Sequence, residues 1–420
     1  MLEISPIFNA MMRHKSHALL LIIQIALTLA IVANAAFIIE NRLTLMNRDS
    51  GLPEAQLFKF DVFSFGKDID LNQQMELDET MLRAIPGVID AVTINQIPIS
   101  GSGDNTIFMD RDDTPNKNNN DKNLHSKSNT PAKHVHTGVY RGDTHTLNTL
   151  GVKLIAGRNF SEDEIIYGNE TQPISVAIVS KAFITTMFPE LKGLEQQGVG
   201  KLIYVFRIPI KIIGIVDKLQ SSQVTSSHIE QTIILPKIQT RNFYRFLIRT
   251  AANQQQAVID KVENLMLKLY PNRVIRTPRT LTYLRDNSYA DDKMMTQLLM
   301  ILIVILFLIT ALGIVGMAVF NVNRRRKQIG TRRALGASKG NIIRYFMIEN
   351  WLITNLGIVL GIALSILLSQ FLMQQFSLPK LDNSYIMATM IAIWLLGIMA
   401  VYFPAKKAAQ ISPAIATRSI

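Results

Sequence analysis

Hydrophobic residues make up 48% of the 420 residues and the mean hydropathy is +0.19, which is too apolar for an ordinary soluble enzyme of this size and too charged for a wholly membrane-embedded protein. The net charge of +12 does not indicate nucleic-acid binding, because residues 40–293 hold 30 basic and 29 acidic residues and the excess lies elsewhere. The chain has no cysteine, which excludes a disulfide framework and thiol chemistry.

The N-terminal segment, residues 1–17, is predicted to be an interfacial amphipathic helix, because apolar residues such as Ile4 and Ile7 follow helical spacing. The apolar run at 18–40 is long enough to cross a bilayer. A cleaved signal peptide is the alternative, but no convincing small-residue cleavage site follows so long an apolar core. We interpret the run as an uncleaved first span, in which Asn34 makes an interhelical hydrogen bond.

Residues 41–293 are predicted to form a large α+β domain made of two small subdomains, one built from both ends of the segment and one inserted in its middle. The predicted strands are 58–65, 88–97, 174–180, 210–217 and 242–250, and the predicted helices are 71–84, 181–188 and 257–270. A low-complexity insertion at about 110–131 cannot bury apolar surface and is predicted to be a mobile loop. A helical stalk at about 279–293 leads back to the membrane.

Three further spans complete the predicted membrane domain. They lie at 294–322, 347–373 and 385–404, with a short external loop at 374–384 and a tail at 405–420. The third span carries small residues at every fourth position, which lets helix backbones approach closely. This stripe, which packs either within one subunit or against a partner, consists of Gly357, Gly361, Ser365 and Ser369.

The segment 323–346 between the second and third spans carries most of the excess positive charge. A short loop this basic belongs on the cytoplasmic side, and so do both termini, which leaves the large domain outside. Topology alone would explain the charge, but the segment also has internal order, with a short helix that stops at Gly336 and a following helix capped by Ser338. We therefore predict a structured docking element, with Glu349 paired either to Arg344 or to the loop.

The residues assigned to this element share the basic segment or the start of the next span. They are Arg324, Arg325, Arg326, Lys327, Ile329, Gly330, Arg332, Arg333, Ala334, Leu335, Gly336, Ser338 and Glu349. Ile329, Ala334 and Leu335 are expected to supply its apolar contact.

The stretch RRKQIGTRRALGASKGNIIRYFMIEN resembles the cytoplasmic loop and following helix of the MacB/FtsX-like ABC transporter permeases. One departure is Gln328, where that family usually has Glu. Weaker similarities to the MacB-type periplasmic core lie in the large domain, at 85–88, 150–152, 157–160, 213–217 and 235–236. Pro404-Ala405-Lys406-Lys407 resembles the closing segment of the family.

The resemblance implies an α-helical membrane protein with four transmembrane helices and a large α+β extracytoplasmic domain inserted between the first and second. It implies a permease subunit in the bacterial inner membrane that dimerises with a second copy or a paralogue and binds a separate cytoplasmic ATPase. Mechanical coupling to the periplasmic domain would drive export of a drug, peptide or lipoprotein-like substrate. A periplasmic adaptor, an outer-membrane channel and membrane lipids would be further partners.

We expect no enzymatic activity and no cofactor on this chain, because these 420 residues contain no G-x-x-x-x-G-K-[ST] phosphate-binding loop; ATP and Mg²⁺ would bind the partner ATPase. His134, His136 and His145 could form a metal site, but the simpler interpretation places the first two on one face of a loop or edge strand. The alternative function is a non-transporting, FtsX-like signalling anchor that activates a periplasmic partner such as a cell-wall hydrolase.

Overall fold

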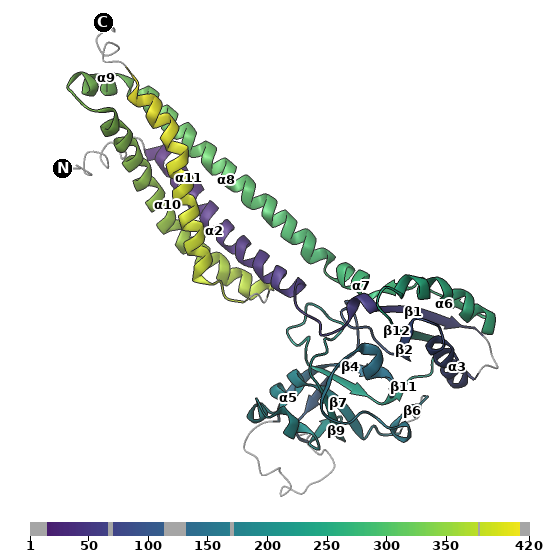
Figure 1. The fold of residues 1–420 in the computed structure, drawn as a ribbon. Coiled ribbons are helices and arrows are strands. Elements are labelled where there is room, and N and C mark those ends of the chain that lie inside the picture. The colour runs from purple at the N-terminus through teal and green to yellow at the C-terminus, as the bar shows by residue number, and fades with distance from the viewer. Residues whose placement is uncertain (1–14, 66–69, 113–131, 169–171, 377–378, 412–420) are drawn as a thin grey trace, which may run out of the picture. The chain divides into compact units, whose positions relative to one another are not determined.

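A computed structural model describes residues 15–65, 70–112, 132–168, 172–376 and 379–411. The chain divides into two compact units, a helical unit formed by Met1–Met46 with Asp291–Ile420 and an α+β unit, Asn47–Ala290 (Figure 1). Most of the expected interfacial helix and of the low-complexity insertion lies outside the described residues.

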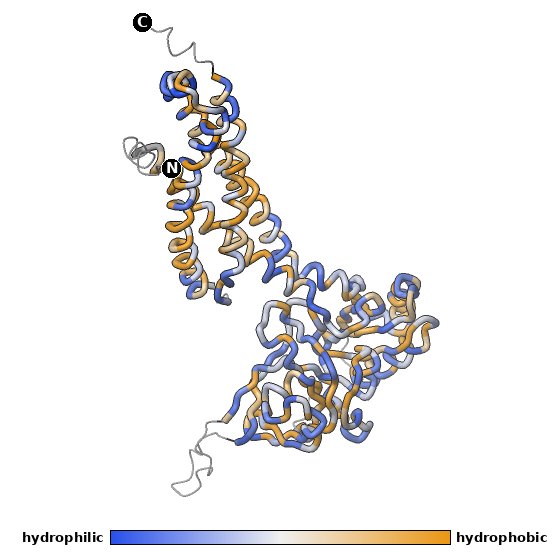
Figure 2. The backbone as a smooth tube through the Cα atoms, turned by 60° about the vertical axis from the view of Figure 1, so that its left-hand side comes forward, coloured by the Kyte–Doolittle hydropathy of each residue, from blue (hydrophilic) through white to orange (hydrophobic). Residues whose placement is uncertain are grey.

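The helical unit contains, in chain order, α2 (Lys15–Met46), α8 (Ala290–Arg324), α9 (Arg326–Ala334), α10 (Lys339–Phe376) and α11 (Asn383–Ala409). Among the described residues, four of these helices, α2, α8, α10 and α11, are long and apolar enough to cross a membrane. Apolar residues cover most of their length, as Figure 2 shows. A protein with such helices is a membrane protein.

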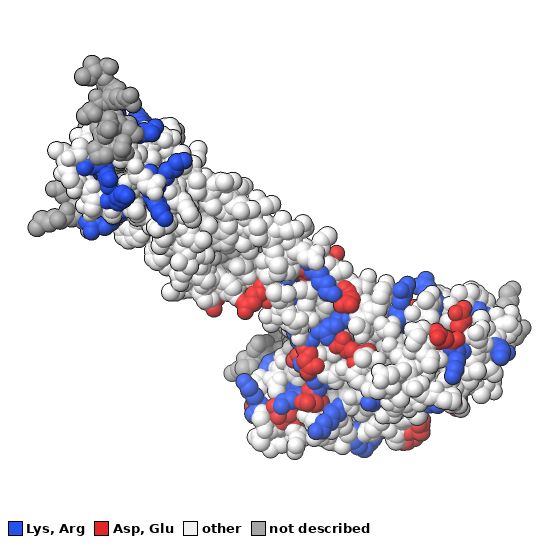
Figure 3. Space-filling model, turned by 45° about the horizontal axis from the view of Figure 1, so that its top comes forward, with Lys and Arg blue, Asp and Glu red and all other residues white. Residues whose placement is uncertain are grey.

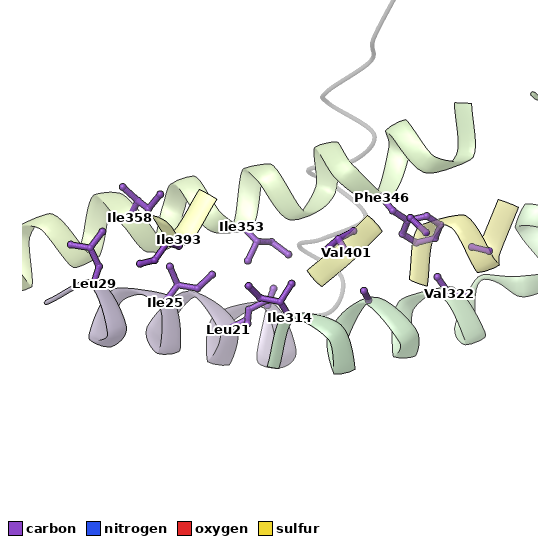
Figure 4. Packing of buried hydrophobic residues seen from close by; sticks show 14 of the residues in the cluster. Leu21, Ile25, Leu29, Ile314, Val322, Phe346, Ile353, Ile358, Ile393 and Val401 are labelled. Atoms are coloured by element: carbon purple, nitrogen blue, oxygen red, sulfur yellow. The ribbon is translucent and has the colours of Figure 1, made fainter. Parts of the chain in front are cut away.

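Apolar side chains from all four long helices meet in one core (Figure 4). The labelled residues of this core are Leu21, Ile25 and Leu29 from α2, Ile314 and Val322 from α8, Phe346, Ile353 and Ile358 from α10, and Ile393 and Val401 from α11. The unit is also tied by polar contacts, since the hydroxyls of Thr28 and Thr310 lie 2.8 Å apart and the Arg42 guanidinium lies 3.1 Å from the Asp292 carboxylate.

The small-residue stripe of α10 packs inside the chain, against α2. A Cβ atom on Gly357 would lie 2.7 Å from Ile25 Cγ2, and one on Gly361 would lie 3.0 Å from the Ala26 carbonyl oxygen. Ser365 is fully buried, and its Oγ accepts a 3.2 Å hydrogen bond from Asn34 Nδ2. The interhelical hydrogen bond expected for Asn34 is therefore present.

The first sheet of the α+β unit uses strands from both ends of the segment. It contains β1 (Leu57–Ser64), β2 (Val88–Thr93), β12 (Phe243–Thr250), β13 (Arg273–Ile275) and β14 (Arg279–Thr280). Alternate residues of β1 point to one face, where Phe58, Phe60 and Val62 pack with the apolar sides of α3 (Leu71–Arg83) and α6 (Gln255–Leu269).

The second sheet comes from the middle of the segment, in the order β5-β9-β7-β10-β4-β3-β8. Its strands are β3 (Asn105–Met109), β4 (His134–Arg141), β5 (Leu154–Gly157), β7 (Val176–Ser180), β8 (Leu202–Val205), β9 (Ile208–Val216) and β10 (Thr232–Leu235). Helix α5 (Lys181–Met187) contributes Phe183 and Ile184 to the core of this sheet. The remaining short elements are β6 (Ile166–Tyr167), β11 (Lys237–Ile238), α4 (Thr146–Leu150) and 3₁₀ turns at Glu54–Gln56, Glu162–Glu164, Pro189–Leu191 and Glu195–Gly198.

The predicted stalk is two helices rather than one. Helix α7 (Leu281–Ser288) begins at Thr280, whose side chain accepts a hydrogen bond from the Tyr283 amide, and it ends before Tyr289. Helix α8 then begins at Ala290. Tyr289 is almost fully buried, so the break lies at a packed residue.

Candidate functional site

The basic segment folds into a helix and a tight turn at one end of the helical unit. Figure 3 shows Lys and Arg side chains gathered there. Helix α9 follows α8 almost without interruption, because the Arg325 amide still bonds to the Asn321 carbonyl at 3.1 Å and the Ile329 amide to the Arg325 carbonyl at 2.9 Å. We call Arg325, α9 and the residues up to Ser338 the basic turn.

The end of α9 is a Schellman motif. Gly336 has φ +93°, and its amide bonds to the Arg333 carbonyl at 3.2 Å while the Ala337 amide bonds to the Arg332 carbonyl at 3.0 Å. Ser338 Oγ accepts from the Asn341 amide at 3.2 Å and so caps α10. The helix stop and the N-cap lie where the sequence pattern predicts them.

An ion pair joins the basic turn to the third long helix. Arg325 donates to both Glu349 carboxylate oxygens, at 2.9 and 3.1 Å, and also to the Tyr345 hydroxyl at 2.8 Å. Both charged side chains are largely buried, with 15% and 6% exposed. A bidentate pair of this kind fixes orientation as well as distance. Glu349 therefore pairs with the loop and not with Arg344.

Tyr345 has a role that the sequence reasoning missed. Its ring also lies beneath Arg332, whose guanidinium carbon is 5.0 Å from the ring centroid. The available signal was the spacing of Tyr345 and Glu349, since residues four apart share one face of a helix.

The apolar residues expected to face a partner differ in their exposure. Leu335 is 83% exposed, and Ala334 and Gly336 are exposed beside it. Ile329 and Gly330 are buried instead, with Ile329 in the same apolar cluster as Phe346. The expectation that Ile329 supplies a docking contact is therefore wrong: its side chain is used to seat α9 on the helices of its own chain.

The remaining basic residues of the segment stand on its outside. Arg324, Arg326, Lys327 and Arg332 are exposed, and Arg333 is partly buried. Gln328 is exposed as well, so the acidic residue usual at this position in the resembled family is not needed for the ion pair that closes the turn.

The three histidines considered as metal ligands do not converge. His134 and His136 are exposed on one face of β4, which is an interior strand rather than an edge strand, and the His136 ring stacks on that of His228. His145 Nδ1 contacts Asp90 at 2.9 Å. No group of three potential metal ligands occurs within the described part of the chain.

The helical end of the chain matches a known family. The family model described as FtsX-like permease C-terminal matches residues 300–413, which include the basic turn and its ion pair. Proteins named Macrolide export ATP-binding/permease protein MacB are similar over a longer range, among them one from Campylobacter jejuni, 24% identical over 275 residues, and one from a Shewanella species, 25% identical over 339 residues. Residues 300–413 therefore resemble the C-terminal part of FtsX-like permeases, and the chain is similar to MacB-type permeases.

The matches leave much of those relatives uncovered. They span 63% and 76% of this chain but only 41% and 51% of the Campylobacter and Shewanella proteins, so the chain spans about half the length of the relatives it matches. Among solved structures, the periplasmic region of MacB from Actinobacillus actinomycetemcomitans is 14% identical with a TM-score of 0.31, covering 56% of this chain and 94% of that one. The extracellular domain of the transporter YknZ is 12% identical with a TM-score of 0.29, covering 52% and 99%.

Proposed function

We propose that this permease couples ATP hydrolysis by a separate cytoplasmic ATPase to movement of its α+β unit outside the membrane. The observation that carries the proposal is the basic turn, which presents an exposed Leu335 while a buried ion pair fastens it to α10. A segment that served only as a topology signal would need its charge but neither the ion pair nor the Schellman motif.

The turn is suited to passing on a displacement. Ile329 seats α9 in the membrane core, and Arg325 and Glu349 hold α9 to α10, so a force on Leu335 would move packed helices and not a free loop. Close-packed interiors transmit such strain because they deform little. Helices α8 and α2 lead directly into the α+β unit along the chain, and they would carry the motion there.

The assembly that we propose places this permease in a bacterial inner membrane with the basic turn in the cytoplasm and the α+β unit in the periplasm. A second permease copy or paralogue would cover part of the outer face of α8, whose apolar residues Leu308 and Leu312 are 59% and 70% exposed. The substrate would be a drug, a peptide or a lipoprotein, handled outside the membrane with a periplasmic adaptor and an outer-membrane channel. The relatives named for macrolide export support the drug class.

The substitution Leu335→Asp tests the coupling. Because Leu335 is already 83% exposed, the variant should fold normally, and the carboxylate should be penalised only when the ATPase covers it. We expect ATPase binding to weaken roughly 30-fold, as for a hot-spot residue worth about 2 kcal/mol. Copurification of the ATPase and an export or resistance assay in cells measure the effect.

Arg326→Ala is the matched control, because Arg326 is exposed and a single surface charge contributes little, typically about 1 kcal/mol or less. It should be nearly silent in both assays. If Leu335→Asp also retains the ATPase and full activity, the basic turn is only a topology signal. Capture of a cell-wall hydrolase by the α+β unit, in place of an adaptor, would instead support the signalling anchor.

A further inference from the structure

A cavity of about 110 Å³ lies where the two sheets of the α+β unit meet, and the proposed coupling does not use it. Strands β2 and β12 of the first sheet, β4 of the second and the short strand β11 all contribute to its lining (Figure 1). Ligands often bind where two structural units meet. The volume is below the roughly 300–1,000 Å³ of pockets that enclose a whole small molecule, so this cavity has room for one chemical group of a ligand.

The lining of this cavity is strongly basic. Among the described residues that form it, four are cationic and none is acidic. The four are Arg141 at the end of β4, Lys237 in β11, Arg241 in the segment before β12, and Arg245 in β12. A concave surface lined by one sign of charge raises the local concentration of ions of the opposite sign. The cavity therefore favours an anion.

Two of these arginines are held in place by carboxylates that lie outside the lining. Arg245 Nε donates to Asp61 at 2.8 Å, and its Nη1 donates to the Asn95 carbonyl oxygen at 3.3 Å. Arg141 Nη1 pairs with Asp104. Within the described residues, Nη2 of each arginine makes no hydrogen bond, and the two side chains remain 22% and 20% exposed. Each guanidinium is therefore oriented while one of its terminal nitrogens stays available to a ligand.

The neighbouring carboxylates do not neutralise the cavity. Asp61 also accepts a 2.6 Å hydrogen bond from Lys59, so this one carboxylate serves two cations. Arg241 is exposed, and no carboxylate of the described residues forms a salt bridge with it. A phosphate monoester carries a charge of about −1.5 to −2 at pH 7 and offers three strong acceptor oxygens, whereas a carboxylate carries a single charge on two oxygens. The excess of positive charge and the separate donors therefore favour a phosphate group.

We propose that this cavity binds a phosphate group. Arg245 donates to it from the first sheet and Arg141 from the second, so that one ligand bridges the two sheets, and Arg241 adds positive charge beside them. Phe243 is 38% exposed and belongs to the same lining, where it would contact the organic part of a phosphate ester. A basic surface that was only solvated would instead bind anions weakly and without preference among them.

Isothermal titration calorimetry of the full chain in detergent micelles measures this binding. Sodium chloride keeps the ionic strength equal in every titration, because salt screens the attraction between exposed charges. The probes are inorganic phosphate, glycerol 3-phosphate and acetate. We expect both phosphates to bind roughly ten-fold more tightly than acetate, as for one additional charge-assisted hydrogen bond. Tighter binding of glycerol 3-phosphate than of inorganic phosphate would assign the site to a phosphate ester, and the reverse order would assign it to free phosphate.

Substitution of the cationic residues tests the contacts. The partner of Arg141, Asp104, is 41% exposed, so Arg141→Gln leaves no buried carboxylate without a counter-charge and the variant should fold. We expect Arg141→Gln to weaken phosphate binding about ten-fold through loss of a charge-assisted hydrogen bond. Arg241→Gln, at an exposed position, should weaken it roughly three-fold. Lys211→Gln is the matched control, since Lys211 is an exposed cation of β9 outside the lining, and it should bind phosphate as the wild type does.

Failure of both phosphates to bind the wild type would overturn the proposal. Acetate binding as tightly as phosphate would overturn the assignment of a phosphate group. Unchanged binding by both Arg141→Gln and Arg241→Gln would place the anion elsewhere, and an equal loss in Lys211→Gln would show an effect of net charge alone; either result would overturn the site. The readout needs no ATPase, so it is independent of the proposed coupling.

Discussion

At the scale of single residues, the α+β unit contains buried charged side chains whose substitution should reduce its stability. Asp78 and Arg273 form an ion pair at 2.6 Å in which both side chains are fully buried, and Asp78 also accepts from the Tyr244 hydroxyl. Burial raises the pKa of Asp78 despite the adjacent Arg273 guanidinium. Removal of either side chain would therefore leave the other buried without its counter-charge.

Arg273→Gln should destabilise the α+β unit by roughly 3–5 kcal/mol, because it leaves Asp78 buried without a counter-charge. Lys201→Gln is the matched control, since Lys201 pairs with Glu190 at 3.7 Å on the surface and should contribute about 1 kcal/mol or less. Pulse proteolysis of the full chain, followed through fragments of the α+β unit, measures both. Equal losses of stability in Arg273→Gln and Lys201→Gln would show that burial does not make the Asp78–Arg273 pair more sensitive to substitution.

A second buried group gives the α+β unit a pH dependence. Burial and the nearby carboxylate of Asp143 raise the pKa of Glu79 to about 8, although Arg83 contacts Glu79 at 2.8 Å. Arg83 also lies 3.3 Å from both Asp90 and Asp143, so one guanidinium serves three carboxylates.

A carboxyl whose pKa is raised by folding holds its proton more tightly in the folded state, so stability falls as pH rises from the ordinary pKa of 4.5 to about 8. We expect Glu79→Gln, which stays neutral, to flatten this fall. Pulse proteolysis of the wild type and the variant across that pH range tests it. Parallel pH profiles for the two proteins would exclude Glu79 as the titrating group.

At the scale of elements, the packing of α10 on α2 depends on glycines with no room for a side chain. A Cβ atom on Gly361 would meet the Ala26 carbonyl oxygen and Leu29 Cβ, both at 3.0 Å, and these groups cannot easily move because they belong to a backbone and to a buried residue. At Gly316 in α8, by contrast, an added Cβ atom would have open space around it.

Gly361→Val should therefore push α10 away from α2, whereas Gly316→Val should be tolerated. Because the chain has no cysteine, the pair Asn34→Cys and Ser365→Cys can report on this contact by oxidative cross-linking. We expect the cross-link to fall several-fold with Gly361→Val and to persist with Gly316→Val. Full cross-linking in the Gly361→Val background would show that the two helices tolerate a larger separation.

At the scale of the whole molecule, the charge distribution predicts which parts of the chain share a side of the membrane. Exposed positions can be labelled without removing native cysteines, since there are none. Ser227→Cys in the α+β unit should react with a membrane-impermeant maleimide from outside, and Lys339→Cys beside the basic turn should react only after permeabilisation. External labelling of Lys339→Cys would overturn the orientation and, with it, the proposed access of a cytoplasmic ATPase.

The sequence by itself determined the features that depend on local composition. Four apolar runs predicted the four long helices, because spanning length depends only on consecutive residues. Strand β9 and helix α6 were predicted because their apolar patterns are strong, and the turn at Gly336 followed from the conformational freedom of glycine. Strand β4, with the polar sequence HVHTGVYR, was predicted only as a loop or an edge strand. Its own pattern is weak, and pairing with β3 and β10 makes it an interior strand.

Only the tertiary structure decided which partner each residue finds. Glu349 was predicted to pair either with Arg344 or with the basic loop, and the placement of α9 against α10 selected Arg325 of the loop. The small-residue stripe could have faced a second subunit, and the approach of α2 assigned it to the chain's own core. Ile329 was expected on a docking surface, but its side chain is buried among apolar residues of its own chain. Hydropathy and charge can be read along a segment, whereas a contact depends on the relative position of two segments far apart in the chain, which the sequence of neither one contains.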